Sequence, residues 1–248
     1  MKKLFPIMTD RTSFGHIFCV FVCWAFCFVV FPFLMPLIAF GSWKDYSVTS
    51  WFECIYNAIN ALMVMGILRK YLKESFFNVQ MDPKGFARDV AITCVLMLIV
   101  ILAEAWILFE LYINPLVTLN AFPMSEMNVA LTSGLMAANN PIFGTICLSL
   151  LTPFAITGLF YVTAFSPLAC RWPALGYLVV AVVMLIPCAF DIFWREQVDF
   201  VLMSYVLRLP VHLLACWSYQ KTDTVWAPIL SLGVINLLTS LVNILILP

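Results

Sequence analysis

Residues 89–113 read DVAITCVLMLIVILAEAWILFELYI. Between Asp89 and Glu104 this stretch contains no charged residue. The hydrocarbon core of a bilayer is about 30 Å thick, and about 20 apolar residues in a helix cross it. The stretch therefore predicts a membrane-spanning helix, and with it an all-α membrane protein.

The composition of the whole chain agrees with this prediction. Of 248 residues, 64% are hydrophobic and 10% are charged, whereas soluble domains have about 25% charged residues. A soluble chain of this length could not cover so much apolar surface. The 13 basic and 13 acidic residues give a net charge of zero, so no bulk field favours nucleic acid, and membrane lipid is the expected surrounding.

Further apolar segments of similar length occur along the chain. The run 15–40 is too long for the apolar region of a signal peptide. We predict a single transmembrane domain, 1–248, built as a polytopic helical bundle of about seven spans. The predicted spans lie near 15–40, 48–68, 89–113, 141–165, 173–190, 197–218 and 226–247.

The basic residues indicate the orientation of these spans. With a cytoplasmic N-terminus, only Lys44 and Arg195 lie on the outer side, and Arg208 lies within a span. Cytoplasmic loops carry an excess of Lys and Arg, so this distribution supports the topology and places the C-terminus outside. The ten cytoplasmic basic residues are Lys2, Lys3, Arg11, Arg69, Lys70, Lys73, Lys84, Arg88, Arg171 and Lys221.

Two loops and the cysteines have distinct compositions. Residues 69–88 are basic and contain aromatic side chains, which is typical of a cytoplasmic interfacial segment or of an ordinary positive-inside anchor. Residues 114–140 contain no Lys or Arg and form the longest outward loop, a candidate external contact surface.

Cys19, Cys23 and Cys27 repeat every four residues, which indicates helix packing rather than a disulfide framework.

Ionisable residues within predicted spans are candidate functional residues, because they are costly at membrane depth. Tyr205, Arg208 and His212 lie on one face of a helix. This face should point into the bundle, since a lipid-facing Arg costs about 2.5–3.5 kcal/mol. We expect Glu104 to be the partner of Arg208. The four residues form either a buried ion pair that fixes helix register or a polar pocket for a substrate or partner side chain.

The sequence predicts no metal site and no cofactor. His16 and His212 are its two histidines, and they do not form the ligand set of a zinc site. Glu110 lies six residues after Glu104 and about 120° around the helix, so the two carboxylates are not paired. The sequence has no Gly-rich phosphate loop and no His-Glu-x-x-His motif.

Residues 219–230 read YQKTDTVWAPIL and are followed by Asn236. This stretch resembles the last motif of the CPBP family, the CAAX-protease and bacteriocin-processing (Abi) intramembrane proteins. In that motif a Tyr-x-x-Thr-x-Ser turn precedes Trp-Ala-Pro-Ile-Leu and a His-x-x-x-Asn helix. Pro153 and Phe160 frame a segment similar to the first motif, Pro before Glu-Glu-x-x-Phe-Arg. The resemblance covers most of residues 50–245 and implies the CPBP fold and a bacterial cytoplasmic membrane.

The chain departs from this family at the catalytic positions. Peptide hydrolysis needs a carboxylate, a histidine or a metal to activate water, and the matching positions here carry none. The resemblance therefore implies a pseudoprotease. The glutamate pair falls on Ile156 and Thr157, the arginine on Tyr161, the Phe-x-x-x-His motif on Phe190 and Trp194, and the last histidine on Leu232.

We therefore expect a non-catalytic scaffold or regulatory partner of another membrane protein or peptide. The family's role in bacteriocin processing and immunity implies a peptide-related function by analogy. Two alternatives stay open: an active intramembrane protease with relocated ligands (Glu104, Glu110, Asp191 or His212) and a transporter subunit. The expected binding groove is lined by Ile156, Thr157, Tyr161, Leu232 and Asn236.

Overall fold

The computed structural model describes residues 50–113, 145–169, 172–195 and 198–246. These residues form helices and no strand, which confirms the all-α class for this part of the chain. The predicted span 15–40 and the whole outward loop 114–140 lie outside the described residues, as do the three clustered cysteines.

The described helices include six long rods and one shorter helix between the first two. Four short segments, η3 to α10, follow one another without a break and make one of the six rods. The elements are α3 (Ser50–Ile67), α4 (Arg69–Met81), α5 (Pro83–Ile113), the π-helical η3 (Cys147–Leu151), α9 (Thr152–Ile156), the π-helical η4 (Thr157–Phe165), α10 (Ser166–Ala169), α11 (Pro173–Arg195), α12 (Val198–Thr222) and α13 (Trp226–Ile246).

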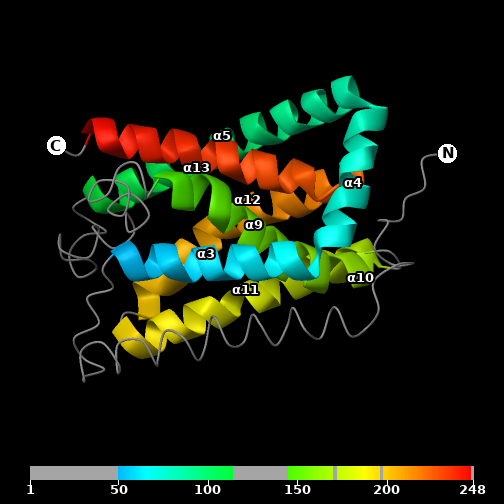
Figure 1. The fold of residues 1–248 in the computed structure, drawn as a ribbon. Helices are drawn as coiled ribbons and strands as arrows, with labels where there is room; N and C mark the ends of the chain where they lie inside the picture. The colour runs from blue at the N-terminus through cyan, green and yellow to red at the C-terminus, as the bar shows by residue number, and fades with distance from the viewer. Residues whose placement is uncertain (1–49, 114–144, 170–171, 196–197, 247–248) are drawn as a thin grey trace.

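The rods coincide with the six predicted segments after 15–40, although four of them extend past a predicted bound: the η3–α10 rod reaches Ala169, and α12 reaches Thr222. α5 already begins at Pro83, and α11 continues to Arg195. Figure 1 shows the rods lying side by side along one direction, while α4 crosses one end of the bundle. We call this the α4 end. The C-terminal part of α13 lies at the opposite end (Figure 1).

The turn from α4 into α5 follows from local sequence chemistry. Asp82 ends α4, and its carboxylate accepts a hydrogen bond of 3.0 Å from the backbone N–H of Gly85. Pro83 occupies the first position of α5, where a helix needs no backbone N–H donor. This cap begins a new helix directly after α4, so the two helices can point in different directions.

Two glycines allow neighbouring helices to approach the η3–α10 rod closely. A Cβ atom at Gly158 would overlap the side chain of Val64 in α3. A Cβ atom at Gly233 in α13 would lie 2.7 Å from the carbonyl oxygen of Ser149 in η3. Small residues at such positions let helix backbones pack at short distance, as is common between transmembrane helices.

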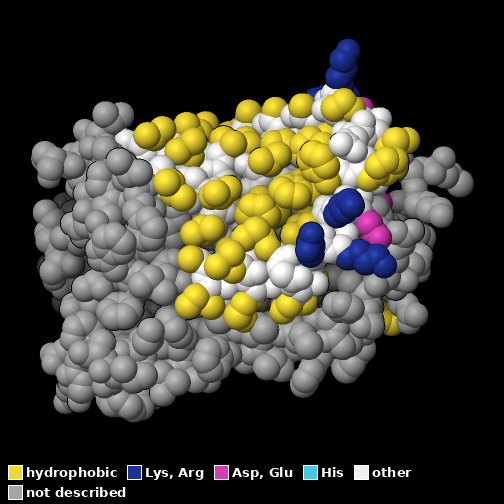
Figure 2. All heavy atoms as spheres, in the orientation of Figure 1, with side chains coloured by type: hydrophobic (Ala, Val, Ile, Leu, Met, Phe, Trp, Pro, Cys, Tyr) yellow, Lys and Arg dark blue, Asp and Glu magenta, His cyan; other side chains and the backbone are white. Residues whose placement is uncertain are grey.

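The interior is apolar, and so is much of the exterior. Met97, Phe160, Val180 and Ala215 are among the fully buried core residues. Figure 2 shows apolar side chains spread over the visible face and basic ones gathered at the α4 end. Among the described residues, two helical stretches are long and apolar enough to cross a bilayer by length and composition: Pro83–Ile107 and Ser149–Ala169.

Candidate functional site

The sequence motif at 219–226 forms the turn between α12 and α13, and α4 packs against it. Thr224 Oγ1 donates to the carbonyl oxygen of Ser75 at 3.1 Å and accepts the N–H of Trp226 at 3.3 Å. Ser75 Oγ accepts the N–H of Val225 at 3.0 Å and lies 2.7 Å from Thr224 Oγ1. A hydroxyl has one proton, so Ser75 donates to Thr224. We call this reciprocal Ser75–Thr224 pair the clasp.

Two aromatic residues extend the contact between α4 and the turn. The hydroxyls of Tyr71 and Tyr219 share a hydrogen bond of 2.5 Å, and both side chains are buried. The indole N–H of Trp226 donates to the carbonyl oxygen of Leu72 at 3.1 Å. Together with the clasp, these bonds fix α4 to the ends of α12 and α13.

The turn itself depends on a left-handed residue. Asp223 has a φ of 54° and reverses the chain between α12 and α13. Asn78 of α4 donates from Nδ2 to the carbonyl oxygen of Asp223 at 2.9 Å. Sequence reasoning did not identify Ser75. Its signal is spacing, because Tyr71, Ser75 and Asn78 lie at i, i+4 and i+7 on one face of α4.

α5 and α12 run antiparallel and carry opposite charges at two levels. Lys221 Nζ lies 3.1 Å from Asp89 Oδ1 at the α4 end. Further along, the charges of Arg208 and Glu104 interact. At 1.5 Å per residue the two pairs are about 20 Å apart on each helix. The partnership of Glu104 with Arg208 stays a prediction, with the interaction of their two charges in its favour.

The prediction that these polar residues are buried is wrong for Arg208. Its side chain is exposed, while Glu104 and His212 are half-buried. Val206 and Pro210, on either side of Arg208, are also exposed, so this part of α12 lies at the bundle surface. The side chain of Tyr205 lies outside the described residues.

Tyr161 connects the two sets of predicted site residues. It occupies the position that the CPBP resemblance gives to an arginine, and it is fully buried in η4. Its hydroxyl forms a hydrogen bond of 2.7 Å with Nδ1 of His212 in α12. The charge of Arg208, one turn away, acts on His212. A polar line thus runs from Glu104 through Arg208 and His212 to Tyr161.

The residues expected to line a groove lie in the packing between helices. Thr157, Tyr161 and Leu232 are buried, and Ile156 and Asn236 are half-buried. Of their helical segments η4, α9 and α13, α9 packs against the other two and against α3. The side chains at the three buried positions thus contact the chain's own helices, and only Ile156 and Asn236 reach the margin of this packing.

Several hydroxyl- or amide-bearing side chains of α3, α13 and the η3–α10 rod have buried polar atoms without a hydrogen-bond partner in the described part of the chain. Both amide atoms of Asn60 in α3 lack a partner, as do Oγ1 of Thr157 and Oγ of Ser149 and Ser231. Leaving a buried polar group unpaired costs about 1–3 kcal/mol. These atoms surround the π-helical part of the rod, and π-helical turns often occur at functional sites. They can bind neutral hydrogen-bonding groups.

No three His, Cys, Asp or Glu side chains within the described ranges gather closely enough to hold a metal ion. Comparison with known proteins adds no relative: no protein-family model, no curated protein and no solved structure matches this chain.

Proposed function

We propose that the chain is a polytopic membrane protein of seven spans that resembles the CPBP family and has no proteolytic activity. It acts as a scaffold or regulatory partner of another membrane protein or peptide, and by analogy with that family resides in a bacterial cytoplasmic membrane. The α4 end faces the cytoplasm in this proposal, because the basic residues gather there (Figure 2).

The apolar exterior supports the membrane-spanning part of the proposal. α5 exposes Val95, Ile99, Leu102 and Trp106, and α13 exposes further leucines along its length. Monomeric soluble proteins rarely expose contiguous apolar patches above a few hundred Å². Acyl chains remove the cost of such a surface, since they are as apolar as leucine.

The identity of the side chains at the matched catalytic positions supports the non-catalytic part. Ile156, Thr157 and Leu232 replace the two glutamates and the histidine of the resembling motifs. None of these three side chains can activate water as a base or hold a metal at neutral pH. Thr157 and Leu232 are also buried against neighbouring helices.

The main observation in favour of a scaffold role is that Arg208 is exposed on α12. A charged residue facing lipid at mid-span costs about 2.5–3.5 kcal/mol, and the attraction between the charges of Arg208 and Glu104 offsets only part of the desolvation cost. A partner helix lying over α12 at this level would exclude lipid from the guanidinium and supply hydrogen-bond acceptors to it. We therefore infer that the partner binds at the Arg208 edge of the bundle.

Site-specific photocrosslinking in native membranes tests this role. A photoreactive residue replaces Tyr205, which lies one turn before Arg208 on the same face of α12 by its spacing, or Leu178 on α11, which is 59% exposed. We expect one discrete protein adduct from position 205 and none from position 178. The adduct should disappear in an Arg208→Leu background and persist in Arg208→Lys. Identical labelling from both positions would refute a partner at this edge.

One observation favours a transporter as a second candidate. The polar line Glu104–Arg208–His212–Tyr161 contains a carboxylate and a histidine, the residue types that relay protons in membrane transporters, while Arg208 between them would stay charged and act electrostatically. Proteoliposome flux would detect such an activity, and Glu104→Gln should abolish it. The same variant, with elemental analysis of the purified protein, tests the remaining alternative of a protease with relocated ligands.

A further inference from the structure

The inner face of α12 leaves the packing of the bundle at Arg208. Spacings of four, three and four residues place a stripe on one face of the helix: Arg208, His212, Ala215 and Tyr219. Exposure increases along this stripe from the fully buried Tyr219 through the half-buried His212 to the exposed Arg208. Val206 lies about 200° around the helix from Arg208 and is exposed as well. At this level α12 is therefore open on two opposite sides, and Arg208 extends from the side that packs inward elsewhere.

α5 carries a matching stripe that ends in the opposite charge. Its members follow the same spacing: Thr93, Met97, Val100 and Glu104. Thr93 and Met97 are fully buried, whereas Glu104 is half-buried. α5 packs against α12, and the charges of Glu104 and Arg208 interact. The inner faces of both helices thus end in one pair of opposite charges at the edge of the packing.

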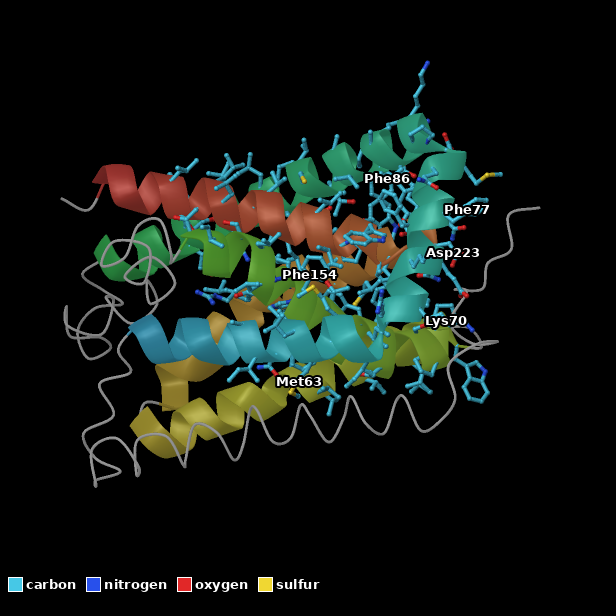
Figure 3. The ribbon with its side chains drawn as sticks, viewed as in Figure 1. Met63, Lys70, Phe77, Phe86, Phe154 and Asp223 are labelled. Carbon is cyan, nitrogen blue, oxygen red and sulfur yellow. The ribbon has the colours of Figure 1, made fainter. Side chains whose placement is uncertain are left out.

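The depth of this pair restricts the charge of any group that binds to it. Figure 3 shows Lys70 and Asp223 at the α4 end, and Arg208 lies about 20 Å further along α12 at 1.5 Å per residue. In a chain that spans the bilayer this level is within the membrane, where a charge without a partner is costly. The charges of Glu104 and Arg208 balance each other. A ligand with a net charge would leave one charge unbalanced, so the pair selects a neutral group.

The hydrogen-bonding capacity of the pair defines which neutral group fits. A guanidinium has five N–H donors, more than one partner can use, and an ionised carboxylate only accepts. The group must therefore accept from Arg208 and donate to Glu104. A carboxamide does both, since its carbonyl oxygen accepts and its NH2 group donates. A serine or threonine hydroxyl within a helix instead bonds to the carbonyl oxygen of its own preceding turn.

We propose that the partner at the Arg208 edge is a transmembrane helix with an Asn or Gln whose carboxamide accepts from Arg208 and donates to Glu104. The proposal rests on the scaffold role and names the chemistry of its partner. Carboxamides form hydrogen bonds between helices within membranes. Because the carboxamide is neutral, it bridges the two charges without replacing their mutual attraction.

Sequencing of the photoadduct from position 205 tests the proposal. The chain with a photoreactive residue at this position is crosslinked in native membranes, and the attached partner peptide is sequenced by tandem mass spectrometry. We expect Asn or Gln within one helical turn of the attachment point. A charged residue there in place of a carboxamide, or only apolar and hydroxyl-bearing residues, would overturn the proposal and leave the scaffold role intact. The absence of any adduct from position 205 would refute the scaffold role as well.

Glu104→Leu supplies a second readout, with Glu74→Leu as the matched control. Glu104→Leu removes the acceptor for the carboxamide N–H, so the yield of the adduct should fall about fivefold, the effect of one lost hydrogen bond. Glu74→Leu removes the same charge from α4, at the end of the bundle, and should keep the original yield. A partner carboxylate would bind Arg208 more strongly once Glu104 is gone. A raised or unchanged yield from Glu104→Leu would therefore contradict the carboxamide, and sequencing decides by itself if this variant does not fold.

Discussion

Replacing Ser75 by alanine tests the clasp, which joins segments far apart in the sequence. The serine is fully buried, and its hydroxyl accepts the N–H of Val225 at 3.0 Å and contacts Thr224 Oγ1 at 2.7 Å. In Ser75→Ala the methyl group fills most of the volume, so the effect comes from hydrogen bonding rather than from a cavity. The N–H of Val225 is left buried without its acceptor.

The expected loss follows from these two bonds. A hydrogen bond contributes about 0.5–1.5 kcal/mol, and leaving a buried donor unpaired costs about 1–3 kcal/mol. We expect Ser75→Ala to lower the free energy of unfolding by about 2–3 kcal/mol. For chains of this size about 1 kcal/mol shifts Tm by about 2–4 °C, so the melting temperature in detergent should fall by about 4–12 °C.

Ser218→Ala is the matched control for this experiment. Ser218 is equally buried near the same end of the bundle, but its hydroxyl has no hydrogen-bond partner. Its removal should therefore leave the free energy of unfolding unchanged or raise it by up to about 1–3 kcal/mol, and should not lower it. Equal melting temperatures for Ser75→Ala and Ser218→Ala would show that the clasp does not stabilise the bundle.

Three further substitutions probe the packing and the polar interior, each read by its melting temperature. Gly233→Ala should lower the free energy of unfolding by about 1–3 kcal/mol, because its Cβ would press on a backbone carbonyl oxygen of η3. The control Gly66→Ala places its Cβ in open space and should be neutral or stabilising. Equal effects of the two substitutions would contradict the close approach of α13 to η3. Asn60→Leu should stabilise the chain by about 1–3 kcal/mol by removing a buried, unpaired amide, and a destabilisation would reveal a bound partner. Tyr161→Phe should cost about 1–3 kcal/mol, since it leaves Nδ1 of His212 without its hydrogen bond, and an unchanged Tm would argue against that bond.

The helical rods could be predicted because their signals are local. The uncharged run after Asp89 determines a long helix, and the Asp82–Pro83 pair supplies a cap and a first-turn proline that place its start. The same pair explains why α5 begins before the predicted residue 89. The cap belongs to the helix even though its first turn is polar.

The side of α12 that faces the bundle was harder to predict than the positions of the helical rods. In soluble helices an apolar stripe marks the inner face, but a helix surrounded by lipid is apolar on both sides. The spacing of Arg208 and His212 correctly places them on one face. The periodicity carries no information on depth, and the structure places Arg208 at the surface and His212 half-buried.

The clasp could not be predicted from local sequence signals, for a different reason. The motif at 219–226 stands out by its composition, but its partner Ser75 is a single serine within a basic segment. The two meet only because α4 crosses the bundle end, which depends on how all the rods pack. The unpaired atoms of Asn60 and Thr157 are likewise products of packing and have no sequence signature.

The sequence separation of 149 between Ser75 and Thr224 has a consequence for the synthesis of the chain. Ribosomes add about 5–20 residues per second, so roughly 7–30 s pass between synthesis of the two hydroxyls. In the later part of that interval α3, α4 and α5 have been synthesised, but the turn at Thr224 that hydrogen-bonds to the inner face of α4 has not. We expect nascent chains that stall before residue 224 to retain this open end, which makes them recognisable to the proteases that remove incomplete membrane proteins.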